Sequence, residues 1–285
     1  METDIVKKIM SMMPTFSKSQ KKIAQAILND YNQTAYITAA KLGDLVGVSE
    51  STVVRFAYEL GYSKYPDFQH AIQKRVCSQM TSNQRIDATA ARFGDADILK
   101  SVMTSDIEKI KFTMENIDRQ AFSASIDALI GAKRIYIIGA RSSASLASFL
   151  NFNLGLIFDN IKFVQPTSTS EVFEQLLHIG QDDVMFAISF PRYSSKMVSA
   201  VDYAHAQGAR VIALTDSLQS PIAANASYVL TAQSDMVSYV DSLTAPLSII
   251  NAVLAAVAQS RRQEVKARFD ELERVWDSYE VYAKQ

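Results

Sequence analysis

Short, continuous apolar runs alternate with longer stretches of helical spacing over the last two thirds of the chain. The apolar runs consist mainly of branched and aromatic residues, which predicts buried β-strands. The predicted strands cover residues 135–138, 161–164, 184–188, 211–214 and 228–230. The stretches between them predict helices at about residues 145–158, 170–178, 194–207 and 220–225. This alternation predicts an α/β domain with a five-stranded parallel sheet sandwiched by helices.

The first predicted strand opens into a turn that is rich in small hydroxyl residues. Gly139 ends the strand, and the apolar spacing from Leu146 to Leu154 predicts a helix directly after the turn. A strand, a tight turn and a helix start can offer an anion several free backbone N–H groups and the positive end of a helix dipole. Ser142 and Ser143 would add hydroxyl donors there, although they could equally do no more than cap the helix.

The third predicted strand ends in a similar loop. Ser189, Ser194 and Ser195 supply hydroxyls, and Arg192 supplies a fork of donors that matches a phosphate. In parallel sheets, ligands bind beyond the carboxyl ends of the strands. Two such loops together predict a site for a small polar ligand that carries a phosphate or carboxylate. The alternative is a capped helix followed by a surface arginine.

The N-terminal region carries several helix boundary signals. Ser17 and Gln20 form a predicted capping box, Thr38 is placed to cap the next helix, and Ser49 to cap a third. Gly47 stands between the last two helices, where a positive φ is needed. The order of helix, glycine turn and helix predicts a helix-turn-helix arrangement, an all-α DNA-binding head.

The start of the third helix in this region is predicted to face outward and to contact DNA. Short hydroxyl side chains let a helix approach phosphates closely, and an arginine can reach a phosphate or a guanine edge. The candidate DNA-binding residues are Lys41, Ser49, Glu50, Ser51, Thr52 and Arg55. The alternative is a plain helical hairpin with a solvated face.

Three segments follow from these patterns: a head at residues 1–78, a linker at 79–97 and a body at 98–285. The linker assignment depends on the polar composition between Gln79 and Asp97 and the lack of a strong apolar period. The body begins with a helical pattern at Ile98 and continues with a helix that Asp118 caps. An amphipathic tail over residues 261–282 could cover its own core or a partner subunit.

The composition narrows these possibilities. The 285 residues have a net charge of −1, but residues 1–80 hold ten lysines and arginines against seven acids, a net charge of +3. This asymmetry is compatible with nucleic acid binding by the head alone. One cysteine and three scattered histidines leave no metal-ligand spacing, so we expect neither a metal nor another cofactor. The longest apolar stretch is broken by Pro246, Ser248 and Asn251, and no signal peptide begins the chain, so we expect a cytoplasmic protein without a membrane partner.

The segment from Lys41 to Phe56, with Glu59-Leu-Gly-Tyr62 after it, resembles the N-terminal domain of the RpiR family of bacterial transcriptional regulators. The Val-Ser-x-x-Thr-Val-x-Arg-Phe core and the Leu-Gly-Tyr close carry the resemblance. Residues of about 120–260 resemble the SIS (sugar isomerase) domain, the usual partner of such a head. The resemblance implies a regulator of sugar metabolism genes that binds double-stranded operator DNA and a phosphorylated sugar.

In SIS domains, the first βα loop and a Ser-x-Ser-Gly-x-Thr loop hold the sugar phosphate. The resemblance carries Ser142 and Ser143 over to the first loop, Ser189 to the first serine of the second loop, and Ser194 to its threonine. The chain departs from the family pattern at three positions. Pro191 stands at the second serine, Arg192 at the glycine of that loop, and Arg141 at a glycine often found in the first loop. Two added arginines imply a tighter anion clamp or a different ligand.

Two functions are compatible with these features. The first is a ligand-controlled transcription factor that works as a homodimer or homotetramer, because a lone helix-turn-helix reads few bases. The second is a sugar-phosphate isomerase with an accessory DNA-binding head. Isomerisation needs a base beside the substrate carbon. Glu171 and His178 are the nearest candidates, and neither lies in a recognisable catalytic motif. We therefore expect a regulator and no enzyme.

Overall fold

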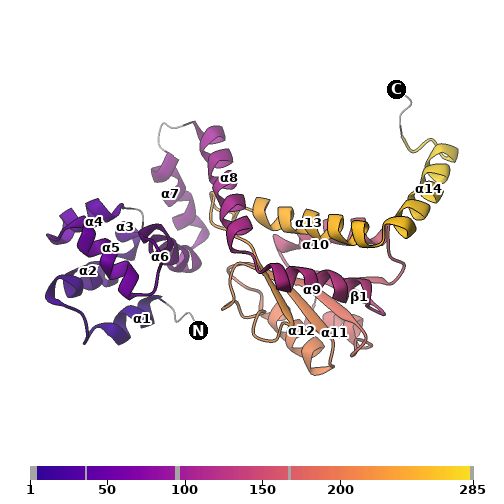
Figure 1. The fold of residues 1–285 in the computed structure, drawn as a ribbon, viewed down its shortest axis with the longest axis horizontal. Helices are drawn as coiled ribbons and strands as arrows, with labels where there is room; N and C mark the ends of the chain where they lie inside the picture. Colours follow the sequence, from indigo (N-terminus) through magenta and orange to yellow (C-terminus); the bar gives the residue numbers. More distant parts are fainter. Residues whose placement is uncertain (1–4, 36, 94–96, 166–167, 283–285) are drawn as a thin grey trace. The chain divides into compact units, whose positions relative to one another are not determined.

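A computed structural model describes residues 5–35, 37–93, 97–165 and 168–282 (Figure 1). The chain divides into two units. The first comprises Met1–Asp95 with Ser238–Val240, and the second comprises Ala96–Val237 with Asp241–Gln285. Among the described residues, no helix combines the length and the apolar character that crossing a membrane requires.

The described part of the N-terminal unit is helical, as its boundary signals predict. Its helices are α1 (Ile5–Met12), α2 (Lys18–Asn29), α3 (Tyr31–Thr34), α4 (Ala39–Val46), α5 (Glu50–Glu59), α6 (Tyr65–Gln79) and α7 (Ser82–Phe93). The Ser17–Gln20 capping box is formed, Thr38 caps α4 and Ser49 caps α5. Gly47 has a φ of 68°, so the glycine turn between α4 and α5 is confirmed.

Close packing fixes α4 against α5. A Cβ atom on Gly43 would lie 2.7 Å from the carbonyl oxygen of Val48, so a glycine is needed at this approach. Phe56 of α5 is fully buried, with its ring centroid 5.0 Å from that of Phe16 and 5.8 Å from that of Phe68. The buried face of α5 thereby anchors the helix and leaves the opposite face exposed.

The predicted linker contains a helix. Residues Ser82–Phe93 form α7, where the sequence pattern indicated an unstructured connector. The backbone N–H of Thr81 donates to the Gln84 side chain (2.8 Å), and the Gln84 N–H donates to the Thr81 hydroxyl (3.3 Å). These two bonds are a capping box, which starts a helix even where the apolar period is weak.

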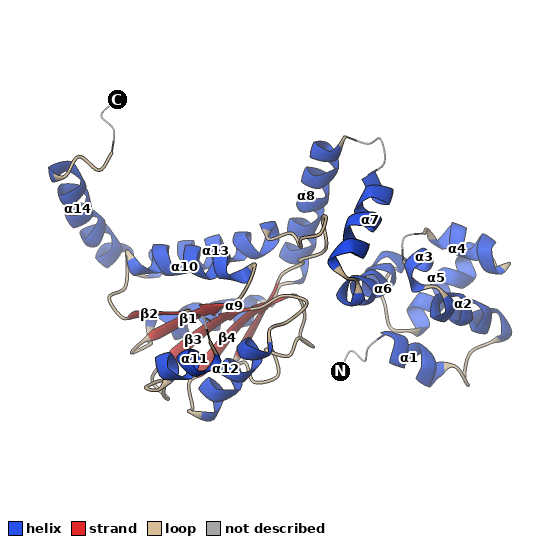
Figure 2. Ribbon diagram, turned by 180° about the vertical axis from the view of Figure 1, so that it is seen from behind, coloured by secondary structure: helices blue, strands red, loops and turns tan. Residues whose placement is uncertain are grey.

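The second unit contains a five-stranded parallel sheet in the order β2-β1-β3-β4-β5 (Figure 2). The strands are β1 (Ile135–Gly139), β2 (Ile161–Val164), β3 (Val184–Ile188), β4 (Arg210–Thr215) and β5 (Tyr228–Thr231). All five predicted strands are confirmed to within a residue or two at their ends.

Helices cover both faces of the sheet, so the predicted fold class is confirmed. The helices of this unit are α8 (Ile98–Asn116), α9 (Arg119–Ile130), α10 (Ser143–Gly155), α11 (Thr169–Leu176), α12 (Ser195–Ala206), α13 (Thr244–Ser260) and α14 (Arg262–Ser278). Ile135 and Ile137 of β1 share one buried cluster with residues of α9, α10 and α13. Tyr136 and Ile138 of the same strand share the other cluster with residues of α11 and α12. This alternation is what a strand buried on both faces requires.

The structure differs from the sequence prediction at residues 220–225 and decides between the two alternatives for the C-terminal tail. Residues 221–225 form turns instead of the predicted helix: the N–H of Ala223 donates to the Ser220 carbonyl, and that of Ala226 to the Ala223 carbonyl. The segment is short and begins with Pro221, which favours a turn. The tail forms α14, and no residue of this helix is buried, so it does not cover the core of its own chain.

The register of the sheet sets the two serine-bearing loops side by side. Gly139 at the end of β1 pairs with Ile188 at the end of β3. A Cβ atom on Gly139 would lie 2.6 Å from the Ser143 carbonyl oxygen and 2.9 Å from the Ala147 Cβ. The first turn of α10 therefore packs directly on the end of β1, and this approach depends on the missing side chain.

We expect Gly139→Ala to destabilise the second unit by about 1–3 kcal/mol, because the added methyl meets backbone that cannot move freely. Gly155→Ala is the matched control, since a Cβ atom there meets nothing within 4 Å. The control should be neutral or stabilising by up to about 1 kcal/mol, because alanine favours a helix more than glycine does. Urea unfolding followed by circular dichroism measures both. Equal stabilities of the two variants would show that the close approach is not needed.

Candidate ligand-binding and DNA-binding sites

The loop after β1 holds three of the predicted ligand-binding residues. Arg141 is exposed and has a left-handed backbone with a φ of 57°. Ser142 precedes α10, and Ser143 is its first residue, with 3% of its surface exposed. The N–H groups of Ser143 and Ala144 donate to the carbonyls of Ala140 and Arg141, at 3.1 Å each. These two amides are therefore engaged within the turn, which contradicts the expectation that they are free.

The loop after β3 holds the other four predicted residues. Ser189 is buried, and its N–H extends the ladder to β4 by donating to the Leu214 carbonyl at 3.1 Å. Arg192 is exposed and left-handed, with a φ of 61°. Ser194 precedes α12, and Ser195 is its first, exposed residue. All seven predicted residues thus stand on two loops that leave neighbouring strands at the same edge of the sheet.

The serines before α10 and α12 do not cap these helices. Neither Ser142 nor Ser194 makes a side-chain capping bond. By contrast, Ser168 accepts from the Glu171 N–H at 3.2 Å, and Ser49 accepts from the Thr52 N–H at 3.3 Å. The alternative that the two loop serines only cap their helices therefore fails for this structure. Their hydroxyls remain available to a ligand.

Tyr193 connects the second loop to the end of β4. Its hydroxyl donates to Asp216 Oδ1 at 2.6 Å, and the Thr215 hydroxyl donates to the same oxygen at 3.2 Å. Burial raises the pKa of Tyr193 above its usual value, and the charge of Asp216 and the hydrogen bond to it add to the shift. Tyr193 therefore stays a neutral donor that holds the loop. The sequence gives no local signal for this contact, because its partners are separated by 23 residues.

The two residues considered as catalytic bases lie apart. The His178 carbonyl accepts a bond from Arg134, the residue directly before β1. His178 thus lies at the amino edge of the sheet, opposite the two loops. Glu171 is an exposed residue in the first turn of α11, at the carboxyl edge.

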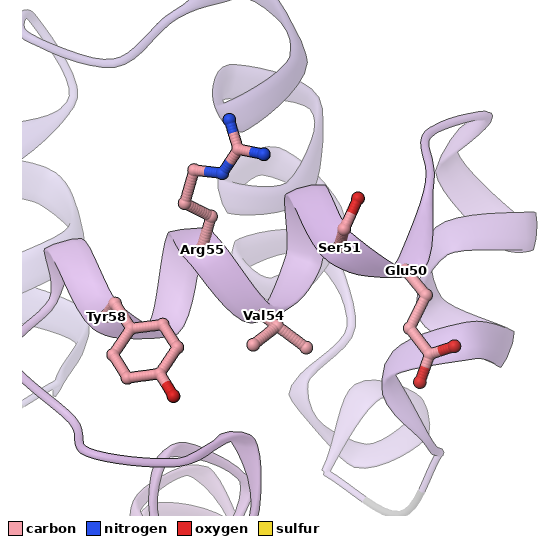
Figure 3. A pocket seen from close by; sticks show the side chains of 5 residues that line it. All are labelled: Glu50, Ser51, Val54, Arg55 and Tyr58. Atoms are coloured by element: carbon pink, nitrogen blue, oxygen red, sulfur yellow. The ribbon is translucent and has the colours of Figure 1, made fainter.

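The exposed face of α5 carries the candidate DNA contacts. Glu50, Ser51, Val54, Arg55 and Tyr58 line a surface depression along this helix (Figure 3). Three of them were predicted, whereas Val54 and Tyr58 were missed. Their spacing could have indicated them, because Val54 lies four residues after Glu50 and Tyr58 lies three residues after Arg55, which puts each on the same helix face as a predicted contact.

The other predicted contacts have different surroundings. Lys41 is exposed on α4. The Ser49 hydroxyl lies 2.8 Å from that of Thr52 and 2.9 Å from that of Ser51, so Ser49 and half-buried Thr52 shape the start of α5.

Comparisons with known proteins agree with this architecture. Residues 3–79 match the helix-turn-helix domain of the rpiR family, and residues 128–256 match the SIS domain. The HexR transcriptional regulator of Escherichia coli is 26% identical over 286 residues, which cover 95% of this chain and 93% of that protein. The chain thus combines a helix-turn-helix domain of the rpiR family with a SIS domain behind it.

Two solved structures are similar. The sugar isomerase domain of an RpiR transcription factor from Sphaerobacter thermophilus is 28% identical with a TM-score of 0.58, over 61% of this chain and 97% of that one. The Vibrio vulnificus NanR protein, complexed with ManNAc-6P, is 21% identical with a TM-score of 0.60, over 98% of this chain and 99% of that one. The second likeness shows that the fold extends over both units.

Replacing the loop serines should barely change stability. We expect Ser142→Ala and Ser194→Ala to lower the free energy of unfolding by less than about 0.5 kcal/mol, because no capping bond is lost. Ser168→Ala is the control, and it should cost about 1 kcal/mol because the Glu171 N–H loses its acceptor. Thermal unfolding of the three variants measures the difference. If Ser142→Ala and Ser194→Ala lost as much stability as Ser168→Ala does, both loop serines would be capping residues.

Proposed function

We propose that this protein is a transcriptional regulator of sugar metabolism genes, controlled by a phosphorylated sugar. Operator DNA binds along α5, and the sugar phosphate binds at the carboxyl ends of β1 and β3. The observation that carries the ligand site is the pair of neighbouring loops whose serines are not used as helix caps. The NanR protein, complexed with ManNAc-6P, shares the fold and supports this class of ligand.

The chemistry of the two loops suits a phosphate. Ser143 and Ser189 each bring a hydroxyl to the two loops, and both residues are more than nine-tenths buried. A serine hydroxyl at such a loop can donate a hydrogen bond to a ligand oxygen. The starts of α10 and α12 add the positive ends of two helix dipoles. The proposed ligand residues are Arg141, Ser142, Ser143, Ser189, Arg192, Ser194 and Ser195.

The head suits recognition in the major groove. The buried face of α5 is locked to α4, and its exposed face presents Ser51, Arg55 and Tyr58. Ser51 and Tyr58 can bind phosphates, and Arg55 can reach a guanine edge. Lys41 adds a positive charge from α4. We propose a homodimer or homotetramer, which places half-sites about 34 Å or a multiple apart.

Regulation follows from linkage between the two sites. A ligand that binds one arrangement of the heads more tightly shifts the population toward it and changes operator affinity. The proposal needs neither a metal nor another cofactor, and it places the protein in the cytoplasm, where operator DNA lies.

We propose that the protein is a regulator and not a sugar-phosphate isomerase. His178 lies at the wrong edge of the sheet for a base, which leaves Glu171 as the remaining one of the two candidates. Turnover of aldose and ketose phosphates by the protein, abolished by Glu171→Gln, would reverse this assignment.

Arg55→Ala should weaken operator binding by at least about tenfold, because one arginine contact contributes about 1–3 kcal/mol per head. The probe is duplex DNA selected by the parent protein from a random pool, measured by fluorescence anisotropy at several salt concentrations. Arg119→Ala removes the same charge from an exposed position of α9 and should bind as the parent does. Unchanged affinity of the Arg55 variant would remove α5 as the reading helix.

Ser189→Ala should weaken binding of a sugar phosphate by about tenfold, because a hydrogen bond to a charged group contributes about 1.5–3 kcal/mol. The ligand is found by a thermal-shift screen of sugar phosphates, since binding raises the melting temperature. Ser199→Ala, an exposed serine in the middle of α12, is the matched control and should bind normally. Equal affinities of the two variants would place the site elsewhere.

A further inference from the structure

We infer that the ligand carries two anionic groups, a phosphate and a second acidic group, and that Arg141 and Arg192 select it. The inference rests on the proposed function and narrows its class of ligand from sugar phosphates in general to doubly acidic ones. The second group is a carboxylate or another phosphate.

The backbone of both arginines is the first observation. Among the described residues, three that are not glycine have a positive φ: Arg141, Arg192 and Glu280. The left-handed region is unfavourable for a residue with a Cβ atom, and glycine adopts it freely. This chain uses glycine at other left-handed positions, namely Gly47, Gly61 and Gly208. Two arginines therefore occupy positions where the backbone favours glycine, which indicates that their side chains have a role of their own.

The free charge is the second observation. Both arginines are exposed, and among the described residues neither guanidinium has a hydrogen-bond or ion-pair partner. The contrast is Arg134 at the opposite edge of the sheet, which binds Asp183 at 2.9 Å. Asp216 is the acid at the neighbouring end of β4, and its Oδ1 accepts from Tyr193 and Thr215. The carboxyl edge thus presents two guanidinium groups that the protein does not pair.

The position of the charges is the third observation. Arg141 follows Gly139 by two residues and Arg192 follows Ile188 by four, and Gly139 and Ile188 are paired in the sheet. Neighbouring strands lie about 5 Å apart, so both arginines leave one small area of the edge. Two like charges repel there unless an anion lies between or beside them.

The loop hydroxyls can hold one phosphate without either arginine. A guanidinium matches a carboxylate or a phosphate with two parallel bonds, so the arginines are suited to a second acidic group. A neutral sugar with one phosphate leaves this charge unmatched, whereas a ligand with two acidic groups matches both sets of donors.

Two matched pairs of compounds test the inference by titration calorimetry on the full chain. Glucose 6-phosphate and 6-phosphogluconate differ in a carboxylate at C1, and fructose 6-phosphate and fructose 1,6-bisphosphate differ in a second phosphate. In at least one pair, we expect the doubly acidic member to bind about tenfold or more tightly, as a charge-assisted bond implies. The pair with the larger ratio identifies the second group.

The variants are Arg141→Gly, Arg192→Gly and the double variant, because glycine keeps the left-handed backbone. We expect each melting temperature to be unchanged or raised. In the pair whose doubly acidic member binds the parent protein more tightly, the ratio of the two dissociation constants should fall to about threefold or less in the double variant. The affinity of that variant for the monophosphate should stay within about threefold of the parent value. Arg119→Ala, which removes a charge outside the loops, should keep the full ratio.

Three outcomes would overturn the inference. The parent protein could bind the monophosphate as tightly as the doubly acidic compound in both pairs. The double variant could keep the same ratio of dissociation constants as the parent protein. It could also lose affinity for both compounds of the pair equally, which would mean that both arginines hold a single phosphate. If the parent protein bound none of the four compounds and no inorganic phosphate, the phosphate site itself and the proposed function would fall.

Discussion

The parallel pairing of β1 with β3 is the constraint on which the proposed ligand site depends. Gly139 and Ile188 are partners at the ends of these strands, so two loops that begin 49 residues apart in sequence start side by side. The missing side chain at Gly139 lets α10 start directly on the strand end. Tyr193 then holds the second loop to Asp216 after β4. With both loops fixed by the sheet, the proposed anion would meet hydroxyls that are already in place.

The same kind of residue serves two purposes in the two units. In the head, the hydroxyl of Ser49 caps α5, the proposed DNA-reading helix, and fixes its start. At the sheet edge, Ser142 and Ser194 stand at equivalent positions before their helices and make no capping bond. The starts of α10 and α12 thus leave hydroxyl donors unused, whereas the start of α5 uses its serine as a cap. This division is what a regulator with a rigid reading helix and an open sensing edge requires.

Local patterns predicted most of the fold. The branched and aromatic strands, the positive φ of Gly47 and the cap at Ser49 are each determined by a few neighbouring residues. Helix α7 was missed because its signal, the Thr81–Gln84 capping box, lies in a polar segment without an apolar period. The seven candidate ligand residues could be assigned to two loops from the sequence. Whether their serines cap and how Tyr193 meets Asp216 depend on three-dimensional packing that no local pattern contains.

Coupling between the two units is the central claim, and the dissociation constant of the operator measures it most directly. It should be determined with the full chain, first without ligand and then with a saturating concentration of the sugar phosphate that binds. The account predicts a change of about fivefold or more, in either direction, which is the usual size of an allosteric coupling. The Ser189→Ala variant should show no change at the same concentration. An operator affinity that stays constant while the parent protein is saturated with ligand would contradict the account.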